Sequence, residues 1–237
     1  MSAQPVQPTD YSIRSFHYRT LIQEGARFYA LADTAVAFDY GGAGDAERVQ
    51  ARRLGLVDLS PLPRCGFKGR EAIQWLRGQG LTIGDENNRA WVQGQSHGPV
   101  VARLADTEAL ILSDTGAKVG VCARLQKTYG TDQPSRCFHV PRRDGSAWFA
   151  VTGEHAGSLF AKLCGVDLRH HKFPSGAVAQ TSLARMNAIV IRADLGQTPI
   201  FFLVFDSASA DYLWGCLKDA MAEFDGAPVG HAALLAL

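Results

Sequence analysis

Histidine and cysteine side chains are the groups in this chain whose types suit metal binding. His170 and His171 are adjacent, so in an extended segment their rings point to opposite sides and do not share a metal ion. The five cysteines are scattered without a Cys-x-x-Cys pair, which argues against a zinc site and a disulfide framework. The pattern indicates reduced thiols in a cytoplasmic protein without a metal site.

Nucleophilic and acid–base groups also lack the partners that they need. Cys164 ends an amphipathic stretch, where a cysteine is usually an inert buried thiol, and no base stands beside it in the sequence. Ser113-Asp114 and Asp206-Ser207 occupy positions where helix caps are expected, and neither pair reads as part of a catalytic triad. We therefore predict no catalytic residue in this chain.

Arg103 and Arg185 are charged side chains in apolar, strand-like surroundings, where an unpaired charge is costly. We expect each to lie at a strand end or to pair with an anion. A second interpretation places both on the wall of a cavity, where they would contact a ligand.

The composition is that of an ordinary globular protein. The chain has 237 residues, of which 46% are hydrophobic and 20% charged. The net charge of +1 gives no electrostatic reason for a nucleic-acid or membrane partner, and the Arg142-Arg143 pair is interpreted as solvated surface. No apolar run approaches the roughly 20 residues of a membrane span. Residues 1–18 lack the pattern of a secretory signal, and their composition predicts a disordered lead-in.

A glycine-rich stretch, Gly41-Gly42-Ala43-Gly44, separates strand-like residues 28–40 from a short helix expected over residues 45–54. A strand, a glycine turn and a helix also form the layout of a nucleotide-binding motif. Glu47 stands where the third glycine is needed, however, and no Gly-Lys-Ser/Thr follows. The stretch is therefore predicted to be a plain turn.

The order of the predicted elements repeats once along the chain. Each half contains a strand, a helix that begins with Gly-x-x-Ala (at Gly69 and Gly153), further strands and an Asp-capped helix. We therefore expect two similar α+β units, residues 19–135 and 136–226, followed by a docked C-terminal tail over residues 227–237.

Turn signals separate the two histidines from the strands that follow them. Pro174 and Gly176 predict a turn, because proline fixes φ and glycine accepts positive φ. Strands are expected over residues 177–184, 183–193 and 200–205.

Several segments, in one order, resemble the glycine-cleavage T-protein family. The N-terminal half carries Gly25-Ala26-Arg27-Phe28, Leu54-Gly55-Leu56-Val57-Asp58 and Gly69-Arg70-Glu71-Ala72. The C-terminal half is more similar to the gamma subunit of heterotetrameric sarcosine oxidase, through Leu163-Cys164-Gly165-Val166-Asp167, Phe173-Pro174, Gly176–Thr181 and Ala210-Asp211-Tyr212-Leu213-Trp214. The resemblance spans about residues 20–225.

The resemblance implies an α+β, T-protein-like folate-binding fold, built from two similar α+β subdomains around a central cavity. Active members transfer a one-carbon unit to tetrahydrofolate, using a strand with an acidic residue and a Thr-Gly-Glu turn that holds the pterin ring. The comparable segments here are Gly98–Leu104, which has no carboxylate, and Leu195-Gly196-Gln197. A Gln amide forms hydrogen bonds but does not act as a carboxylate base. The candidate cofactor-binding residues on the cavity wall are Arg103, Arg185 and Gln197.

The function that the resemblance implies is a non-catalytic gamma-type subunit of a sarcosine oxidase-like complex, which contributes assembly and stability. Such a complex oxidises sarcosine and passes the one-carbon unit to tetrahydrofolate. No cofactor is expected on this chain, although tetrahydrofolate stays open, and FAD, FMN and NAD are expected on alpha and beta partner subunits. One alternative is a stand-alone tetrahydrofolate-binding aminomethyl- or methyltransferase-like protein, because residues 23–60 resemble a full T-protein N-terminus. Another is a folate-binding regulatory protein without turnover.

Overall fold

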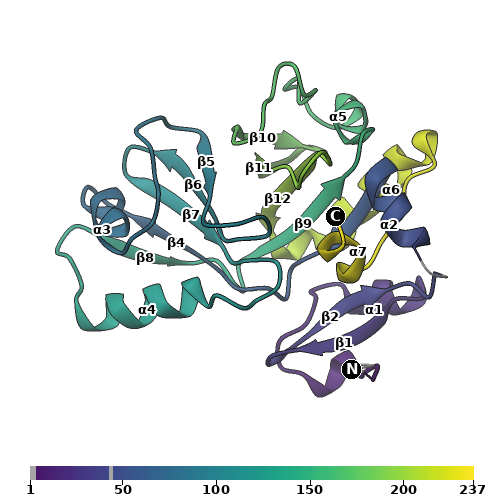
Figure 1. Cartoon of the computed structure of the whole chain (residues 1–237), viewed down its shortest axis with the longest axis horizontal. Helices are drawn as coiled ribbons and strands as arrows, with labels where there is room; N and C mark the ends of the chain where they lie inside the picture. Colours follow the sequence, from purple (N-terminus) through teal and green to yellow (C-terminus); the bar gives the residue numbers. More distant parts are fainter. Residues whose placement is uncertain (1–3, 43–44) are drawn as a thin grey trace.

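The computed structural model describes residues 4–42 and 45–237, which form two β-sheets, the helices packed against them and an N-terminal hairpin (Figure 1). One sheet has five strands in the order β5-β6-β7-β4-β8, and the other has six in the order β10-β11-β12-β9-β3-β13. Figure 1 shows the five-stranded sheet on the left and the six-stranded sheet in the centre. Among the described residues, no helix combines the length and the apolar character needed to cross a bilayer.

The N-terminal segment consists of helix α1 (Tyr18–Gln23) and an antiparallel hairpin of β1 (Arg27–Leu31) and β2 (Thr34–Asp39), preceded by a 3-10 turn at Pro8–Asp10. The hairpin lies at the lower right of Figure 1.

Part of the lead-in that the composition predicts to be disordered is packed against the fold. The Val6 amide donates a hydrogen bond of 2.8 Å to the Phe28 carbonyl, which adds an extended residue beside β1. His17 is buried, with its ring 5.1 Å from that of Phe149 and 4.8 Å from that of Trp214. Residues 4–18 therefore differ from the prediction because their apolar and aromatic side chains find partners far along the chain. Residues 1–3 lie outside the described part.

The first unit is the five-stranded sheet with two helices on its outer face. Its interior is an apolar cluster in which Phe67, Trp75 and Leu125 are buried between the sheet and the helices. The elements are β4 (Arg64–Lys68), α3 (Ala72–Gly78), β5 (Arg89–Val92), β6 (Val100–Ala105), β7 (Glu108–Leu112), α4 (Val121–Thr131) and β8 (Phe138–Pro141).

The second unit is the six-stranded sheet, which also takes in a strand from the N-terminal part of the chain. Its elements are α2 (Ala46–Leu54), β3 (Gly55–Asp58), β9 (Ser146–Thr152), α5 (Ala156–Leu159), β10 (Val178–Leu183), β11 (Met186–Arg192), β12 (Ile200–Asp206), α6 (Ala210–Met221), β13 (Ala227–Pro228) and α7 (His231–Leu235), with 3-10 turns at Phe160–Lys162, Ser207–Ser209 and Ala222–Phe224. The glycine-rich stretch predicted to be a plain turn runs through residues 43–44, which lie outside the described part.

Strand β12 shows how the second sheet is buried on both faces. Phe201, Leu203 and Phe205 face the outer cluster beneath α6, while Phe202 and Val204 face the first unit. Alternate side chains of a strand point to opposite faces, so an unbroken apolar run suits a strand between two layers. The apolar cluster between the units contains residues of both sheets and holds them together.

The two units share one topology, as the sequence repeat predicts. In each unit the first strand (β4 or β9) lies between the last strand of the hairpin (β7 or β12) and a further strand (β8 or β3). The Gly69 amide donates to the Thr107 carbonyl, and the Gly153 amide donates to the Pro199 carbonyl at the matching turn. Both glycines have positive φ, +131° and +101°, and a Cβ on either would lie within 2.5 Å of a backbone atom of the neighbouring segment.

The boundary between the units differs from the predicted one. Strand β8 (138–141) pairs with β4 of the first unit, and β3 (55–58) pairs with β9 of the second. The chain therefore crosses between the units twice, once at residues 59–63 and once at residues 142–145.

One buried guanidinium joins both crossings. Arg64 is 1% exposed and donates to the carbonyls of Ser60 and Leu62 in the first crossing. It also donates to the carbonyl of Arg143, at 2.6 Å, in the second crossing and to that of Ser146, the first residue of β9. Burial lowers the pKa of Arg64 to about 10, so the group is still charged at neutral pH.

The C-terminal tail is docked on its own chain. Helix α7 lies against β2, α2 and β3, with Ala233 and Leu234 buried in the cluster between the units. His231 is 1% exposed, and its Nε2 atom lies 2.6 Å from the Thr115 carbonyl of the first unit. The tail thus fastens the two units to each other.

Candidate functional site

Two segments, Gly98–Leu104 and Leu195–Gln197, are the ones that the resemblance compares with the folate-binding parts of active relatives. They face each other across the interface between the units. Gly98 and Val100 come from the first unit, at the start of β6, while Ala193 and Leu195 come from the turn that follows β11. Phe202 of β12 closes the space from below. The free volume enclosed by these residues is about 10 Å³.

That space is too small for a folate ring system. Ligand pockets usually enclose about 300–1,000 Å³, and a single water molecule needs about 10–15 Å³. Val100, Leu195 and Phe202 are at most 6% exposed, so their side chains fill the position. The central cavity implied by the resemblance is therefore closed at this point by packed apolar side chains.

Polar groups of His97 and Asp114 beside the closed space are used within the fold, whereas the buried Ser113 hydroxyl, which lines the space, has no hydrogen-bond partner in the described part of the chain. His97 Nδ1 lies 3.1 Å from Thr115 Oγ1, and burial lowers the pKa of His97. The Asp114 carboxylate accepts hydrogen bonds from the amides of Lys118 and Val119. This turn explains why α4 begins at Val121 rather than at the predicted Asp114 cap. No carboxylate lines the closed space among the residues that the structure describes.

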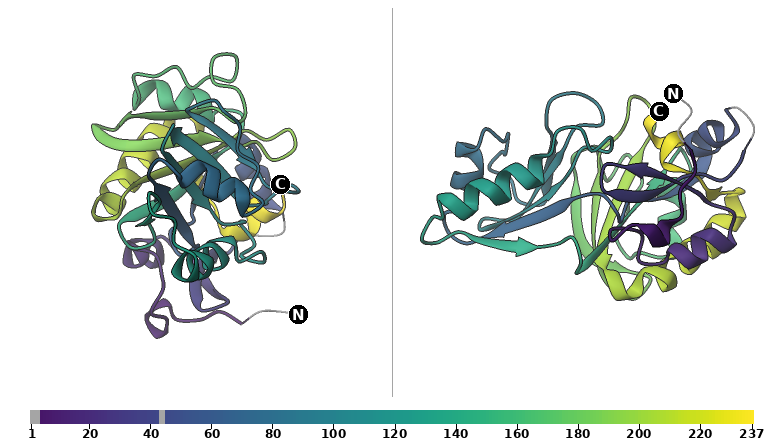
Figure 2. Two further views of the ribbon diagram at one scale, coloured as in Figure 1. Left: turned by 90° about the vertical axis from the view of Figure 1, so that its left-hand side faces the viewer. Right: turned by 90° about the horizontal axis from the view of Figure 1, so that it is seen from below.

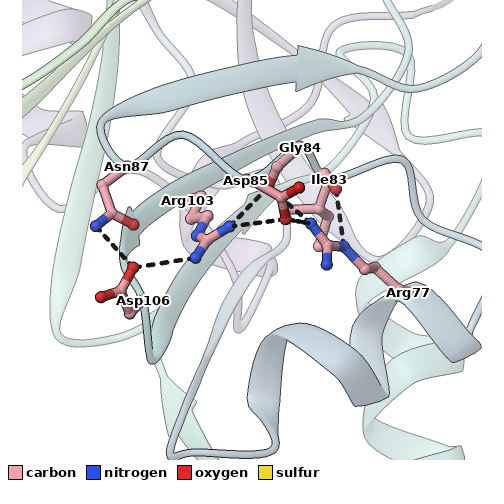
Figure 3. A network of polar contacts seen from close by, with 7 residues as sticks. All are labelled: Arg77, Ile83, Gly84, Asp85, Asn87, Arg103 and Asp106. Atoms are coloured by element: carbon pink, nitrogen blue, oxygen red, sulfur yellow. Dashed lines mark hydrogen bonds and ion pairs between the residues drawn. The ribbon is translucent and has the colours of Figure 1, made fainter.

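Arg103 lies on the opposite face of the first sheet from the interface. Its neighbours in β6, Ala102 and Leu104, belong to the cluster between the units, so the Arg103 side chain points to the outer face. Its guanidinium donates to the Gly84 carbonyl at 2.9 Å and to Asp106 at 3.1 Å (Figure 3).

Figure 3 also shows Asp85 between the two arginines of this network. Arg77 donates to Asp85 at 2.7 Å, and this hydrogen bond lowers the pKa of the Asp85 carboxyl. Arg103 is 3.6 Å from the same carboxylate oxygen. Arg103 is thus paired with anions, as one interpretation of the sequence expects, but its surroundings give no support to a role on the cavity wall.

Arg185 lies at the exposed tip of a hairpin and not within a strand. The strand predicted over residues 183–193 is interrupted, because Ala184 and Arg185 have φ of +48° and +66° and form a two-residue turn. Such turns normally use Asn or Gly, so the sequence contains no turn signal here. At this exposed tip, the Arg185 side chain is not on the wall of a cavity.

Gln197 and the two adjacent histidines border one surface hollow of about 580 Å³. His170 and His171 lie in a turn and not in an extended segment, so the condition under which their rings would face opposite sides is not met. Their ring centroids are 5.8 Å apart and both rings border the hollow. The described residues nevertheless contain no group of three or more His, Cys, Asp or Glu side chains that could hold a metal ion.

An ion pair at the base of this hollow was not identified in the sequence. Arg192 is 6% exposed and forms a two-pronged contact with Asp194, at 2.8 Å for each prong. It also donates to the Phe173 carbonyl, and it lies over the Phe201 ring. The signal in the sequence is a charged residue at the end of an apolar strand with an acid two positions later, a spacing that puts both on one face.

The larger open space is a trough of about 730 Å³ beside the first unit, and its lining includes Val204, which faces that unit, and Gln180, which donates to the Leu104 carbonyl. Its floor includes Gln180, Asn187 and Val204, and Arg142 stands at its edge. Arg142 differs from the predicted solvated surface, because it is paired with Glu108 at 3.0 Å and is largely covered. Apart from the exposed Asp206 at one end, the trough lining carries no acid, base or nucleophile array that would define a reaction.

The geometry defines a duplicated α+β protein, and comparison with known proteins agrees with this fold. The sequence profile of the GCVT N-terminal domain matches residues 92–237, which is more than half of the chain. The chain therefore belongs to the GCVT N-terminal domain family. A search of curated protein sequences finds no match.

Two solved structures share the fold at low sequence identity. The glycine cleavage system aminomethyltransferase T from Bartonella henselae is similar with a TM-score of 0.71 and 18% identity, over 93% of this chain and 60% of that one. This chain thus spans well under two thirds of that protein. A chain of the heterotetrameric sarcosine oxidase from Corynebacterium sp. U-96, solved with pyrrole 2-carboxylate, is similar with a TM-score of 0.62 and 18% identity, over 78% of this chain and 93% of that one. The T-protein-like α+β fold is confirmed.

Proposed function

We propose that this chain is a non-catalytic, gamma-type subunit of a sarcosine oxidase-like complex and contributes assembly and stability. The observation that carries the proposal is the closed space between the start of β6 and the turn after β11. Leu195 and Phe202 help to fill this space, which lies between the two segments compared with the folate-binding ones, and its free volume is about 10 Å³.

The size of the matched oxidase chain supports the proposal. Because 78% of 237 residues is about 185 residues, and these make up 93% of the matched chain, that chain is about 200 residues long. It comes from a heterotetramer, so a chain of this size and fold occurs as one component of a larger enzyme. In the proposed complex, FAD, FMN and NAD belong to alpha and beta subunits, and the complex works in the cytoplasm.

Calorimetry with tetrahydrofolate tests the closed interface. The purified chain is expected to give no binding heat at concentrations where a micromolar site would be saturated, because the ring would have to displace Leu195 and Phe202. Leu195→Gly, which removes a side chain from the space, is the matched variant and is expected to bind no worse than the wild type. A dissociation constant in the micromolar range or below for the wild type would contradict the proposal.

Co-expression tests the assembly role. The chain is expected to co-purify with alpha- and beta-like sarcosine oxidase subunits from the same genome, and its loss should lower the yield or thermal stability of the complex. Recovery of an intact, equally stable alpha–beta complex that never retains this chain would refute the role.

The alternative is a stand-alone tetrahydrofolate-binding protein of the aminomethyl- or methyltransferase type. It is favoured by the similarity to the Bartonella aminomethyltransferase over 93% of this chain and by the open trough beside Arg142 and Gln180. Under this alternative the tetrahydrofolate titration gives saturable binding, and Gln180→Leu, which removes a polar group from the trough floor, weakens it.

A further inference from the structure

A cluster of two cations and one aromatic ring on the N-terminal segment takes no part in holding the two units together. The guanidinium carbon of Arg14 lies 5.0 Å from the centre of the Tyr18 ring, and that of Arg19 lies 5.2 Å from it. Ile22 stands one helical turn after Tyr18 and is 44% exposed. We call Arg14, Tyr18, Arg19 and Ile22 the α1 patch.

The α1 patch is positively charged and lacks a counter-charge of its own. Within the described residues, neither Arg14 nor Arg19 has a carboxylate within the 4.0 Å of an ion pair, and the Arg14 guanidinium donates to the neutral Tyr11 carbonyl. Two guanidinium groups held over one ring repel each other, and a nearby carboxylate from another molecule would relieve that repulsion.

The support beneath the patch is rigid. His17, directly before Tyr18, is buried between Phe149 and Trp214. Thr20 donates to Asp211 of α6 at 2.6 Å, which fixes the helix from its other side. A rigid patch loses little conformational entropy when a partner binds. In the left view of Figure 2 the N-terminal segment stands at one end of the molecule. Arg19 and Ile22 are exposed, and Arg14 and Tyr18 are partly exposed, so the patch is accessible.

Interface centres are enriched in tyrosine and arginine and depleted in lysine and acids, which is the composition of this patch. From these observations we propose that the α1 patch docks an acidic surface of a partner subunit, with carboxylates of the partner placed against Arg14 and Arg19 and an apolar side chain against Ile22. This inference rests on the proposed function, because it assigns the surface through which the chain joins its complex.

The test is a charge reversal with a matched control. Arg14→Glu/Arg19→Glu reverses the patch, while Arg124→Glu/Lys127→Glu makes the same charge change on the exposed face of α4, whose two cations also have no ion pair in the described chain. Each is co-expressed with tagged alpha-like and beta-like subunits from the same genome, and thermal melts confirm that each variant is folded.

The patch variant is expected to bind the subunits at least about tenfold more weakly than the wild type, while the α4 variant binds normally. Wild-type binding should also weaken as salt rises from about 0.05 to about 0.5 M. Equal capture of the patch variant and the wild type would overturn the docking surface and leave the proposed function standing. Failure of the wild type to bind would refute the function itself. A third outcome is that light scattering shows a dimer for the wild type and a monomer for the patch variant, while both capture the subunits equally. That outcome would show that the patch binds a second copy of this chain, and it would refute the proposed acidic partner.

Discussion

Replacing Arg64 tests whether one side chain holds both crossings between the units. Arg64→Met keeps the approximate length of the side chain and removes the guanidinium. Four carbonyls lose a charged donor, three of them buried and one, that of Arg143, partly buried. An unsatisfied buried acceptor costs about 1–3 kcal/mol, but methionine avoids the cost of burying a charge. The expected net loss of unfolding free energy is about 3–5 kcal/mol.

A loss of that size is measurable by thermal and urea unfolding. In a chain of this length each kcal/mol lowers the melting temperature by about 2–4 °C, so Arg64→Met should melt about 6–20 °C below the wild type. Arg64→Lys keeps the charge, but its single nitrogen cannot reach both crossings. Its melting temperature should therefore lie between those of the wild type and of Arg64→Met. Arg89→Met is the control, because Arg89 is partly exposed and has a single ion pair, with Glu86, so the change should stay within about 0.5 kcal/mol. An Arg64→Met variant within about 1 kcal/mol of the wild type would refute the reasoning.

Two further changes probe the docking of the tail on the first unit and a tight turn within the second unit. Burial lowers the pKa of His231, so the unfolded chain takes up a proton near pH 6.5 while the folded chain does so only at lower pH. Stability should therefore fall as the pH drops below about 6.5, and His231→Gln should flatten this part of a melting-temperature profile; an unchanged slope would argue against His231 as its source. Gly153→Ala should cost about 3 kcal/mol or more in urea unfolding, because φ is +101° and the new Cβ would lie 2.5 Å from the Arg53 carbonyl. Gly145→Ala, where nothing lies within 4 Å, is its control, and equal losses would contradict the steric argument.

Local patterns in the sequence predict much of the fold. Helix α6 follows from the helical spacing of its apolar residues, which places them on one face, and strand β12 follows from a short unbroken apolar run rich in Phe and Val. The turn before β10 follows from Pro174 and Gly176, and the structure forms it, with the Ala177 amide donating to the Pro174 carbonyl at 3.0 Å.

Features that depend on distant partners are not visible in the sequence. Strand β3 joins the second sheet because β9, some ninety residues later, lies beside it, and nothing in residues 55–58 indicates this. The turn at Ala184-Arg185 lacks the residues that such turns usually have, since its geometry is imposed by the two strands that it joins. The closed space beside Leu195 depends on how the two sheets are packed, which is a tertiary property.

The double crossing of the chain has a consequence for how the protein is made. During synthesis, residues 55–58 leave the ribosome long before β9 exists, so β3 has no sheet to join while residues 59–141 can already complete the first unit. A fragment covering residues 59–145 is therefore a candidate for independent expression. A fragment that starts at residue 146 lacks β3, so one side of β9 is left unpaired and the second sheet is incomplete. The second unit therefore needs segments from both the N-terminal and the C-terminal parts of the chain.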